Sequence, residues 1–312
     1  MSILIKLNNV SKNYHSLKRN GFSFKWEIIN ILNKVNLEIN SKEVFGLIGH
    51  NGSGKTTLLK IISGLLLADS GEILFDNQKY DFNTHKVGYV NNNFRSFYWR
   101  LTGRQNLDFF SSLTNLSKSE SREKICFFSN YFGIEEKLDK KFMFYSSGEM
   151  QYLSIIRSLL ADPKLLLLDE PSSSLDPLNR EKLIRLSKTY LLEEGITCIW
   201  CTHNLDELDQ VCENFGIMSE GKIKVFKDLN EKDTLCESYT FKVLSKDLKK
   251  LDSNNFNYDL ISKEEKFVQI KINSNGMSLN TCLKFFLNRD IKIFSIDKNY
   301  FKKEIKKKLF EQ

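Results

Sequence analysis

The residues best suited to chemistry begin with the glycine-rich run Gly49-His-Asn-Gly-Ser-Gly-Lys-Thr-Thr. Its three glycines, Gly49, Gly52 and Gly54, allow the backbone to curl so that successive N–H groups point at one anion. Lys55 would then bring positive charge to the β- and γ-phosphates of a nucleotide, and the Thr56 hydroxyl would be an oxygen ligand for Mg²⁺. This spacing of Gly, Lys and Thr predicts a phosphate-binding loop.

The segments on either side of the run have the patterns that such a loop needs. An apolar stretch at 44–48 predicts a buried strand before it, and the periodicity of 56–63 predicts a helix after it. A glycine-rich turn before an ordinary helix is the alternative, and this context argues against it. We therefore expect the other residues of the run to contact nucleotide as well: His50, Asn51, Ser53 and Thr57.

A pair of acidic residues is the second candidate for chemistry. Four leucines at 165–168 predict a buried strand, and Asp169 and Glu170 follow it directly. Asp169 is expected to hold Mg²⁺ through water, and Glu170 to polarise the water that attacks the γ-phosphate. Acidic residues also occur where a strand simply reaches solvent, but a phosphate-binding loop in the same chain favours the catalytic interpretation.

Three further motifs narrow the class of nucleotide hydrolase. Phe144-Tyr-Ser-Ser-Gly-Glu-Met-Gln opens a predicted helix, Ser172-Ser-Ser-Leu-Asp-Pro follows the acidic pair, and His203 ends the next predicted strand. With these motifs in this order, the chain resembles the ATP-binding subunits of ABC transporters over about its first 228 residues. The resemblance implies a P-loop ATPase domain with a mixed sheet and a helical subdomain, and an ATP hydrolase that uses ATP and Mg²⁺.

The resemblance implies that four residues form the signature loop, which caps the γ-phosphate held by the opposite subunit of a dimer: Ser146, Ser147, Gly148 and Glu149. The signature of the family is Leu-Ser-Gly-Gly-Gln, whereas this chain has Tyr145-Ser-Ser-Gly-Glu. The hydrogen-bond donors are kept, and we expect the extra side chain of Ser147 to slow closure of the dimer.

The same resemblance assigns roles outside the loops already named. His203 is similar to the switch histidine that contacts the γ-phosphate, and Tyr14 to the aromatic residue that stacks on adenine. Leu175 and Asp176 match the loop that couples two sites. Asn92 stands where the family has a glutamine that senses Mg²⁺ and contacts the membrane partner, so it is assigned to both the coupling loops and the metal site.

The surrounding pattern predicts an α/β domain at 1–228 and a small, basic α+β domain at 229–312. In the first, strands are expected at 34–39, 44–48, 88–90, 165–168 and 196–201, and helices at 56–63, 105–113, 148–160 and 178–192. In the second, strands are expected at 240–244, 267–272 and 291–296, a helix at 279–287, and a Lys-rich helix at the end. Alternation of strands and helices favours a mixed or parallel sheet covered by helices.

Residues 15–30 are an apparent insertion relative to the family. They contain Phe22, Phe24 and Trp26, which we expect to pack as a local cluster rather than to form a second ligand site. The six cysteines are too dispersed for a disulfide framework and are expected to be reduced. Cys198 and Cys201 have the spacing of a metal site, but the apolar run around them favours two core cysteines.

The charge of the chain is uneven. Of the net +7, most lies in residues 229–312, which carry 17 Lys and Arg against 12 Asp and Glu. A solvated face explains such a surplus, and attraction to anionic lipid or to nucleic acid is the alternative.

No apolar run is long enough to cross a bilayer, and the first residues lack the features of a signal peptide. We therefore expect a cytoplasmic protein, and the resemblance to ABC transporter subunits implies a place at the inner face of the cell membrane.

The segment 94–110 is rich in aromatic and Arg residues and is similar to that of bacterial ABC-2 exporters of drugs, lipids or polysaccharides. Such a mixture suits a docking groove for a permease, and a surface helix with buried aromatics is the alternative. The resemblance thus implies a motor subunit that dimerises head to tail around two Mg-ATP, with itself or a related ATPase, and drives a separate permease, in export. The rival function is a soluble ABC ATPase that acts on nucleic acid or ribosomes. The single cassette and the short spacing of Asn92 and Ser146 disfavour it, so no nucleic acid is expected.

Overall fold

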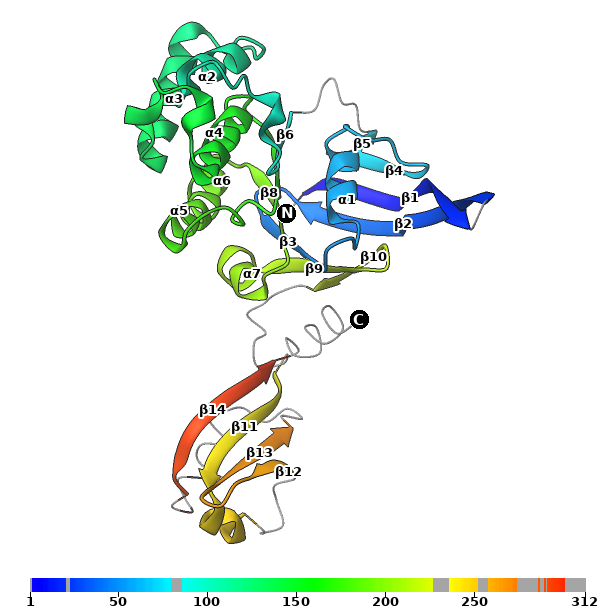
Figure 1. Cartoon of the computed structure of the whole chain (residues 1–312), viewed down its shortest axis with the longest axis vertical. Coiled ribbons are helices and arrows are strands. Elements are labelled where there is room, and N and C mark those ends of the chain that lie inside the picture. The colour runs from blue at the N-terminus through cyan, green and yellow to red at the C-terminus, as the bar shows by residue number, and fades with distance from the viewer. Residues whose placement is uncertain are drawn as a thin grey trace. The chain divides into compact units, whose positions relative to one another are not determined.

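The computed structural model describes residues 2–20, 23–79, 86–226, 236–251, 258–273, 286, 289 and 291–300. The chain divides into two compact units, Met1–Lys227 and Asp228–Gln312 (Figure 1). Within the described part of the chain, no helix is both long and apolar enough to span a membrane.

A six-stranded sheet forms the centre of the first unit. Its strands run in the order β10-β9-β3-β8-β7-β6, and all neighbouring pairs are parallel except β9 with β10. The strands are β3 (Val44–Ile48), β6 (Val87–Val90), β7 (Leu165–Asp169), β8 (Thr197–Thr202), β9 (Asn214–Ser219) and β10 (Lys222–Phe226). Every residue of β3, β7 and β8 is buried, which is why these strands are continuous apolar runs without alternation. The strand predictions at 44–48, 88–90, 165–168 and 196–201 are confirmed to within one residue.

A second, antiparallel sheet has the strand order β2-β1-β4-β5. Its members are β1 (Ile3–Asn20), β2 (Ser23–Asn40), β4 (Ser70–Phe75) and β5 (Gln78–Lys79). One hydrophobic core includes side chains from this sheet, from β3 and β7 of the central sheet, and from α1 (Lys55–Ile62). Burial of one face of α1 in this core therefore fixes the helix that follows the glycine-rich run.

The apparent insertion at 15–30 is the outer part of the β1–β2 hairpin. The prediction of a packed aromatic cluster is wrong for Trp26, whose side chain is 64% exposed. Among the described strands, this part of the hairpin pairs only across its own ladder, so no further strand there covers the ring. Phe22 and the side chain of Phe24 lie outside the described residues.

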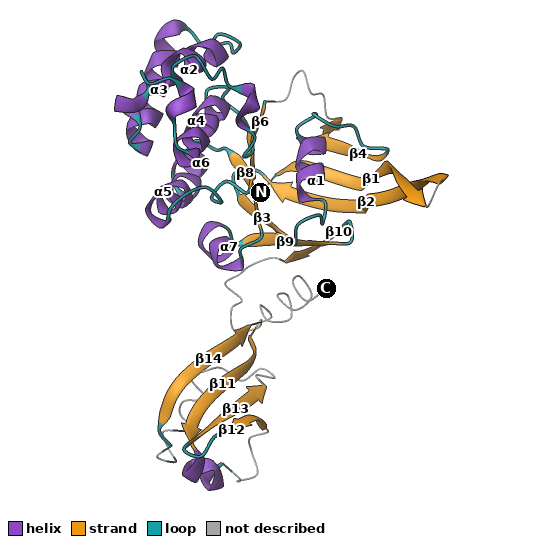
Figure 2. Cartoon of the chain, viewed as in Figure 1, coloured by secondary structure: helices purple, strands orange, loops and turns teal. Residues whose placement is uncertain are grey.

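Helices gather on one side of the first unit (Figure 2). They are α2 (Gly103–Ser111), α3 (Lys118–Phe132), α4 (Ser147–Leu159), α5 (Pro177–Lys188), α6 (Tyr190–Glu193) and α7 (Leu205–Val211), with short 3-10 turns at Phe94–Ser96, Glu135–Lys137 and Phe142–Phe144. The helix expected at 178–192 is broken at Thr189. The Thr189 hydroxyl and the Thr189 N–H both donate to the Arg185 carbonyl oxygen, and a hydroxyl bond of this type bends a helix.

The burial of Cys198 and Cys201 decides between a metal site and two core cysteines. Cys198 and Cys201 lie in β8 with fully buried thiols, and burial raises the pKa of both. The prediction that they are core cysteines is confirmed. A thiol whose pKa is raised in this way is a poor nucleophile and a poor metal ligand at neutral pH.

The second unit is a four-stranded antiparallel sheet in the order β12-β13-β11-β14 with its own hydrophobic core. Its elements are β11 (Cys236–Leu244), a 3-10 helix (Ser245–Lys250), β12 (Tyr258–Lys263), β13 (Phe267–Asn273) and β14 (Ile293–Tyr300). Three of these strands were expected. Most of the helix expected at 279–287, and the Lys-rich tail from 301 onward, lie outside the described residues.

Candidate nucleotide-binding and hydrolysis site

The glycine-rich run forms the turn between β3 and α1. Gly52 and Gly54 adopt left-handed backbone angles, with φ of +85° and +105°, which favour glycine. At Gly49 an added Cβ would lie 2.5 Å from the Met218 carbonyl oxygen and from Ser53 Oγ, so the space also requires glycine. Gly54 is the N-cap of α1 and has no side chain to bond the first N–H groups. These donors are thus left free to bind an anion.

Lys55 directs its ammonium group back over this turn. The side chain is only 6% exposed, and Nζ donates to the carbonyl oxygens of Gly49 at 2.7 Å and His50 at 3.2 Å. The same Nζ lies 3.8 Å from Glu170 Oε1. A buried positive charge is therefore held between the loop and the acidic end of β7.

Asp169 is the last residue of β7 and faces the start of α1. Its Oδ2 accepts hydrogen bonds from Thr56 Oγ1 at 2.8 Å and from Tyr89 OH at 3.2 Å. Its Oδ1 is buried and has no hydrogen-bond partner among the described residues. One carboxylate oxygen is thus engaged by the protein, and the other is left to a ligand.

Glu170 has a left-handed backbone, with φ of +53°, which is uncommon for a residue with a side chain. Its backbone N–H donates to the Cys201 carbonyl oxygen at 3.0 Å, so the turn is tied to β8. Its Oε2 lies 2.7 Å from Nδ1 of His203, which follows β8. Strained backbone of this kind is concentrated at functional sites. The structure brings together Lys55, Glu170 and His203 from three separate segments.

These groups fit a nucleotide phosphate and a magnesium ion. The free Oδ1 of Asp169 and the hydroxyl of Thr56 are hard oxygen donors, the type that Mg²⁺ prefers. Ser53 Oγ is likewise buried without a hydrogen-bond partner in the described part of the chain. Buried polar atoms are normally satisfied, so these orphaned oxygens are explained by a ligand that the loop is shaped to hold.

The other residues predicted to contact nucleotide or metal lie in the loop after β6, in the glycine-rich turn and the start of α1, and on β1. Asn92 Nδ2 donates to the Glu170 carbonyl oxygen at 3.2 Å and to Ser173 Oγ at 2.7 Å, so the loop after β6 is joined to the loop after β7. His50 Nδ1 lies 2.8 Å from the Asn51 carbonyl oxygen, and Thr57 is half-buried at the start of α1. Tyr14 lies on β1, opposite Ile29 in the ladder, and is partly exposed.

The segment Tyr145 to Glu149 is built differently. Ser146 is the N-cap of α4 and accepts from the Glu149 N–H at 3.3 Å, while Glu149 Oε2 accepts from the Ser146 N–H at 2.9 Å. Lys137 pairs with the other carboxylate oxygen of Glu149. Burial acts to raise the pKa of Glu149, but the bonds from Lys137 and Ser146 outweigh it and lower this pKa. Tyr145 OH donates to the Lys137 carbonyl oxygen at 2.6 Å, and burial raises its pKa to about 12.

This segment is joined to the loop of Leu175 and Asp176 but not to the phosphate-binding turn. A Cβ on Gly148 would lie 3.3 Å from Leu175 Cδ2, so the backbone of this segment packs closely against that side chain. Asp176 is the N-cap of α5 and accepts from the Asn179 N–H at 2.9 Å, a bond that lowers the pKa of Asp176. Among the described residues, no hydrogen bond or ion pair links 146–149 to 49–57.

Two participants were missed by sequence reasoning. Tyr89 reaches Asp169 from β6, and burial raises the pKa of its hydroxyl. Its place in a predicted strand beside Asn92 was a usable signal. No sequence pattern pointed to Lys137, because this residue lies in a 3-10 turn that no motif connects with Glu149.

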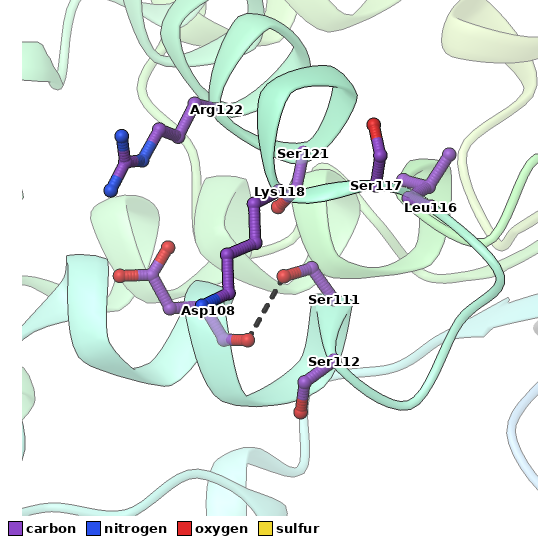
Figure 3. A pocket seen from close by; sticks show the side chains of 8 residues that line it. All are labelled: Asp108, Ser111, Ser112, Leu116, Ser117, Lys118, Ser121 and Arg122. Carbon is purple, nitrogen blue, oxygen red and sulfur yellow. Dashed lines mark hydrogen bonds between the residues drawn. The ribbon is translucent and has the colours of Figure 1, made fainter.

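Two hollows lie near the helices. One of about 450 Å³ is lined by Tyr89, Asn91, Arg95 and Arg157, among others, so it adjoins Asn92. Arg157 stacks over Phe97 and Phe110 beside it. The other, of about 270 Å³, lies between α2 and α3, where Ser111 bonds the Asp108 carbonyl oxygen (Figure 3). None of the predicted site residues lines the second hollow.

The aromatic segment after β6 is partly buried and partly exposed. Phe97 is buried and stacks on Phe142, with ring centroids 4.6 Å apart. Tyr98 and Trp99 are about half exposed, at 49% and 48%. Burial of Phe97 agrees with the alternative of buried aromatics, while the half-exposed rings of Tyr98 and Trp99 present apolar surface to solvent. Docking of a permease on this segment stays a prediction.

Comparison with known proteins agrees with this geometry. A sequence model of the family described as ABC transporter matches residues 32–173. A second model, an AAA domain described as a putative AbiEii toxin of a type IV toxin–antitoxin system, matches residues 141–209. An uncharacterised ABC transporter ATP-binding protein of Bacillus subtilis, YdbJ, is 32% identical over 272 residues, covering 85% of each chain. Another from the same organism, YxlF, is 35% identical over 198 residues, covering 63% of this chain and 65% of its own.

Solved structures show the same fold. The dimeric ATP-binding cassette MJ0796, in a post-hydrolysis state bound to ADP and phosphate, is 28% identical with a TM-score of 0.63 and covers 72% of this chain and 98% of its own. CbiO1 of Clostridium perfringens, part of the ABC transporter complex cbiONQ, is 28% identical with a TM-score of 0.62 and covers 75% and 92%. The chain is thus a P-loop ATPase of the α/β class that hydrolyses ATP, and it belongs to the family of ABC transporter ATP-binding proteins.

Proposed function

We propose that this chain is the motor subunit of a membrane exporter. Two copies, or one copy and a related ATPase, close head to tail around two ATP and Mg²⁺, and this cycle drives a separate permease at the inner face of the membrane. Residues 1–228 are the ATPase domain and residues 229–312 an accessory α+β domain in this proposal.

The observation that carries the proposal is the separation of the site into two parts. Lys55, Asp169 and Glu170 converge on one cluster, while Ser146 presents an exposed helix start with no contact to that cluster among the described residues. A second ATPase subunit, turned to bring its Ser146 to this cluster, would complete the site. The dimeric cassette with bound ADP and phosphate supports this arrangement, since it is similar in fold over most of the ATPase domain.

The geometry supports a division of labour within the cluster. Glu170 would accept a proton from the attacking water, and His203, 2.7 Å from its Oε2, would hold the carboxylate in position. Lys55 and the N–H groups of the 49–57 run would bind the phosphates. Thr56 and Asp169 would hold Mg²⁺, with Asn92 at the edge of the metal site; when bound, this ion would neutralise charge on the phosphate oxygens.

The half-exposed rings of Tyr98 and Trp99, with the hollow beside Asn92, support a docking place for the permease. Aromatic and Arg side chains supply contact area with little loss of conformational entropy.

Export is proposed because segment 94–110 resembles that of ABC-2 exporters. A methionine import ATP-binding protein of Oceanobacillus iheyensis, MetN 1, is also similar, at 29% identity over 74% of this chain. The direction therefore needs its own test.

Capture of the partner tests the proposal. Tagged chain with Glu170→Gln is recovered from detergent-solubilised membranes of the native host, with Mg-ATP and without nucleotide, and the accompanying proteins are identified by mass spectrometry. A membrane-spanning partner is expected, and transport by the isolated complex in inverted vesicles then gives the direction. Recovery of ribosomal proteins or nucleic acid without a membrane protein would assign the chain instead to the soluble ABC ATPases.

A further inference from the structure

Tyr89 reaches the acidic end of β7 from the strand beside it. In the parallel pair of β6 and β7, Tyr89 lies opposite Leu167, and Asp169 lies two residues further along β7. Side chains two residues apart in a strand point to the same face of the sheet, so Tyr89 and Asp169 share a face. The tyrosine side chain spans the offset between them, because its hydroxyl donates to Asp169 Oδ2 at 3.2 Å.

The protein holds the Asp169 carboxylate by one of its two oxygens. Thr56 Oγ1 also donates to Oδ2, at 2.8 Å, so this oxygen accepts two hydrogen bonds. Oδ1 is buried and accepts no hydrogen bond from the described residues. Rotation of the carboxylate would break both bonds to Oδ2, which are costly to lose in a buried place. The two donors therefore determine which oxygen of Asp169 is left for a ligand.

Of these two donors, Tyr89 is the one to which the proposed site gives no other role. The Thr56 hydroxyl is expected to bind Mg²⁺ itself. Packing is the alternative role for Tyr89, since its ring contacts the hydrophobic core around α1. Phenylalanine would fill that space as well, but it has no hydroxyl to donate. A hydrogen bond to an ionised carboxylate is stronger than one between neutral groups, so the effect of the hydroxyl is separable from that of the ring.

We propose that Tyr89 is a positioning residue for the magnesium ion. Together with Thr56, its hydroxyl holds the Asp169 carboxylate by Oδ2 and leaves Oδ1 for the ion. Groups that hydrogen-bond a metal-binding carboxylate orient it, and their loss commonly lowers metal affinity by roughly 10- to 100-fold. The inference rests on the proposed function in one respect, the assignment of Asp169 to Mg²⁺, and adds a residue that acts through this carboxylate.

Binding of Mn²⁺, which can replace Mg²⁺ and is detected directly, tests the inference. The purified full chain with ADP is titrated with Mn²⁺, and the unbound ion is measured by electron paramagnetic resonance. Tyr89→Phe keeps the ring and removes the hydroxyl, and it should bind Mn²⁺ about tenfold more weakly. Its Kd for ADP in EDTA should stay within about twofold of that of the unchanged protein, because the phosphate-binding turn is intact.

The magnesium dependence of ATP hydrolysis is the second readout. In Tyr89→Phe, the Mg²⁺ concentration that gives half of the maximal rate should rise by about tenfold. The kcat at saturating Mg²⁺ should stay within about twofold of that of the unchanged protein, because excess ion compensates for weaker binding. A merely structural loss would instead lower kcat at every Mg²⁺ concentration.

Tyr131→Phe is the matched control. The hydroxyl of Tyr131, on α3, donates to the Lys182 carbonyl oxygen at 3.3 Å, so its removal should leave Mn²⁺ binding unchanged. Equal Mn²⁺ binding by Tyr89→Phe and Tyr131→Phe would overturn the inference, and so would a lower kcat at saturating Mg²⁺ with unaltered Mn²⁺ binding.

A third variant distinguishes this outcome from a failure of the proposed function. Asp169→Asn removes the charge of the carboxylate and should lose most of the Mn²⁺ binding, because carboxylate oxygens are the donors that such ions prefer. If Asp169→Asn binds Mn²⁺ as tightly as the unchanged protein, the assignment of Asp169 to the metal is itself wrong. If Asp169→Asn loses the ion while Tyr89→Phe keeps it, the metal assignment stands and only the role of Tyr89 is refuted.

Discussion

The phosphate-binding edge of the central sheet and the start of α4 satisfy their polar groups in opposite ways. At the edge, Asp169 Oδ1 and Ser53 Oγ are buried without hydrogen-bond partners among the described residues. At the start of α4, Ser146 and Glu149 bond each other's backbone N–H, and Lys137 pairs with the remaining oxygen. The polar groups at the edge of the sheet need a ligand to be satisfied, whereas those at the start of α4 are satisfied by the protein itself.

This difference suits the edge of the sheet to binding the nucleotide, and the start of α4 to meeting a second subunit. Buried orphaned oxygens carry a desolvation cost that a bound ligand removes, so the edge is arranged for a ligand before one arrives. A self-capped helix start remains ordered in water and can meet a second subunit without refolding. Variants at the edge should therefore affect nucleotide chemistry directly, whereas variants at the start of α4 should act through the encounter of two subunits.

The largest effect is expected from Glu170→Gln. Loss of the proton acceptor should lower the rate of ATP hydrolysis by about 10³-fold, the range of general base catalysis, while ATP still binds. The same variant should accumulate as a dimer with Mg-ATP in size-exclusion chromatography. Glu220→Gln, an exposed carboxylate in the turn between β9 and β10, is the control. Hydrolysis by Glu170→Gln at the normal rate would remove Glu170 from the mechanism.

The second effect concerns nucleotide affinity. Lys55→Ala removes the buried ammonium group that lies over the loop, and a charge-assisted hydrogen bond of this kind contributes about 1.5–3 kcal/mol. We expect the Kd for ATP to rise by roughly 10- to 100-fold in calorimetric titration. Lys60→Ala, on the exposed face of the same helix, should leave the Kd unchanged. An unaltered affinity in Lys55→Ala would contradict the loop assignment.

Two helices that begin in the same way sharpen the comparison further. α3 and α4 each start with a capping box, formed by Ser117 with Glu120 and by Ser146 with Glu149. Ser117→Ala and Ser146→Ala should each lower the free energy of unfolding by about 1 kcal/mol in denaturant titrations. Only Ser146→Ala should also slow ATP hydrolysis. If the two variants slow it equally, Ser146 is a helix cap and nothing more.

A smaller effect is expected at Lys137. Lys137→Met leaves the carboxylate of Glu149 uncompensated near the proposed phosphate contact, and the expected loss of ATP hydrolysis is about fivefold, or ~1 kcal/mol for a partly exposed pair. Adding Glu149→Gln should restore most of the rate, because the unpaired charge is removed while the cap is kept. A double variant as slow as Lys137→Met alone would show that Lys137 acts in another way.

The smallest effect is a dependence on pH. The pKa of Glu149 is lowered below its ordinary value of 4.5, so its charge stabilises the fold fully above that value and less as pH falls through the lowered pKa. Unchanged protein and Glu149→Gln should differ in unfolding free energy by about 0.5 kcal/mol at neutral pH. This difference should vanish in strongly acidic solution. A difference that grows as the pH falls would contradict the ion pair.

Much of the fold could be predicted because its elements carry their own signals. The leucines of β7 and the apolar run of β3 are buried on both faces, so their composition alone marks them as strands. The break at Thr189 escaped prediction because the added hydroxyl bond leaves the apolar periodicity intact. The exposure of Trp26 also escaped it, since nothing in a local pattern says whether a second layer will cover a hairpin.

The sequence by itself determined the glycine-rich turn, its lysine and threonine, and the acidic end of the neighbouring strand. These follow from interactions among residues close in the chain and from runs of apolar residues, which local sequence specifies. Only the tertiary structure decided that Tyr89 shares Asp169 with Thr56, and that Lys137 neutralises Glu149. The physical reason is that hydrogen bonds and ion pairs between distant segments form only where packing of the sheet and helices brings their side chains within reach.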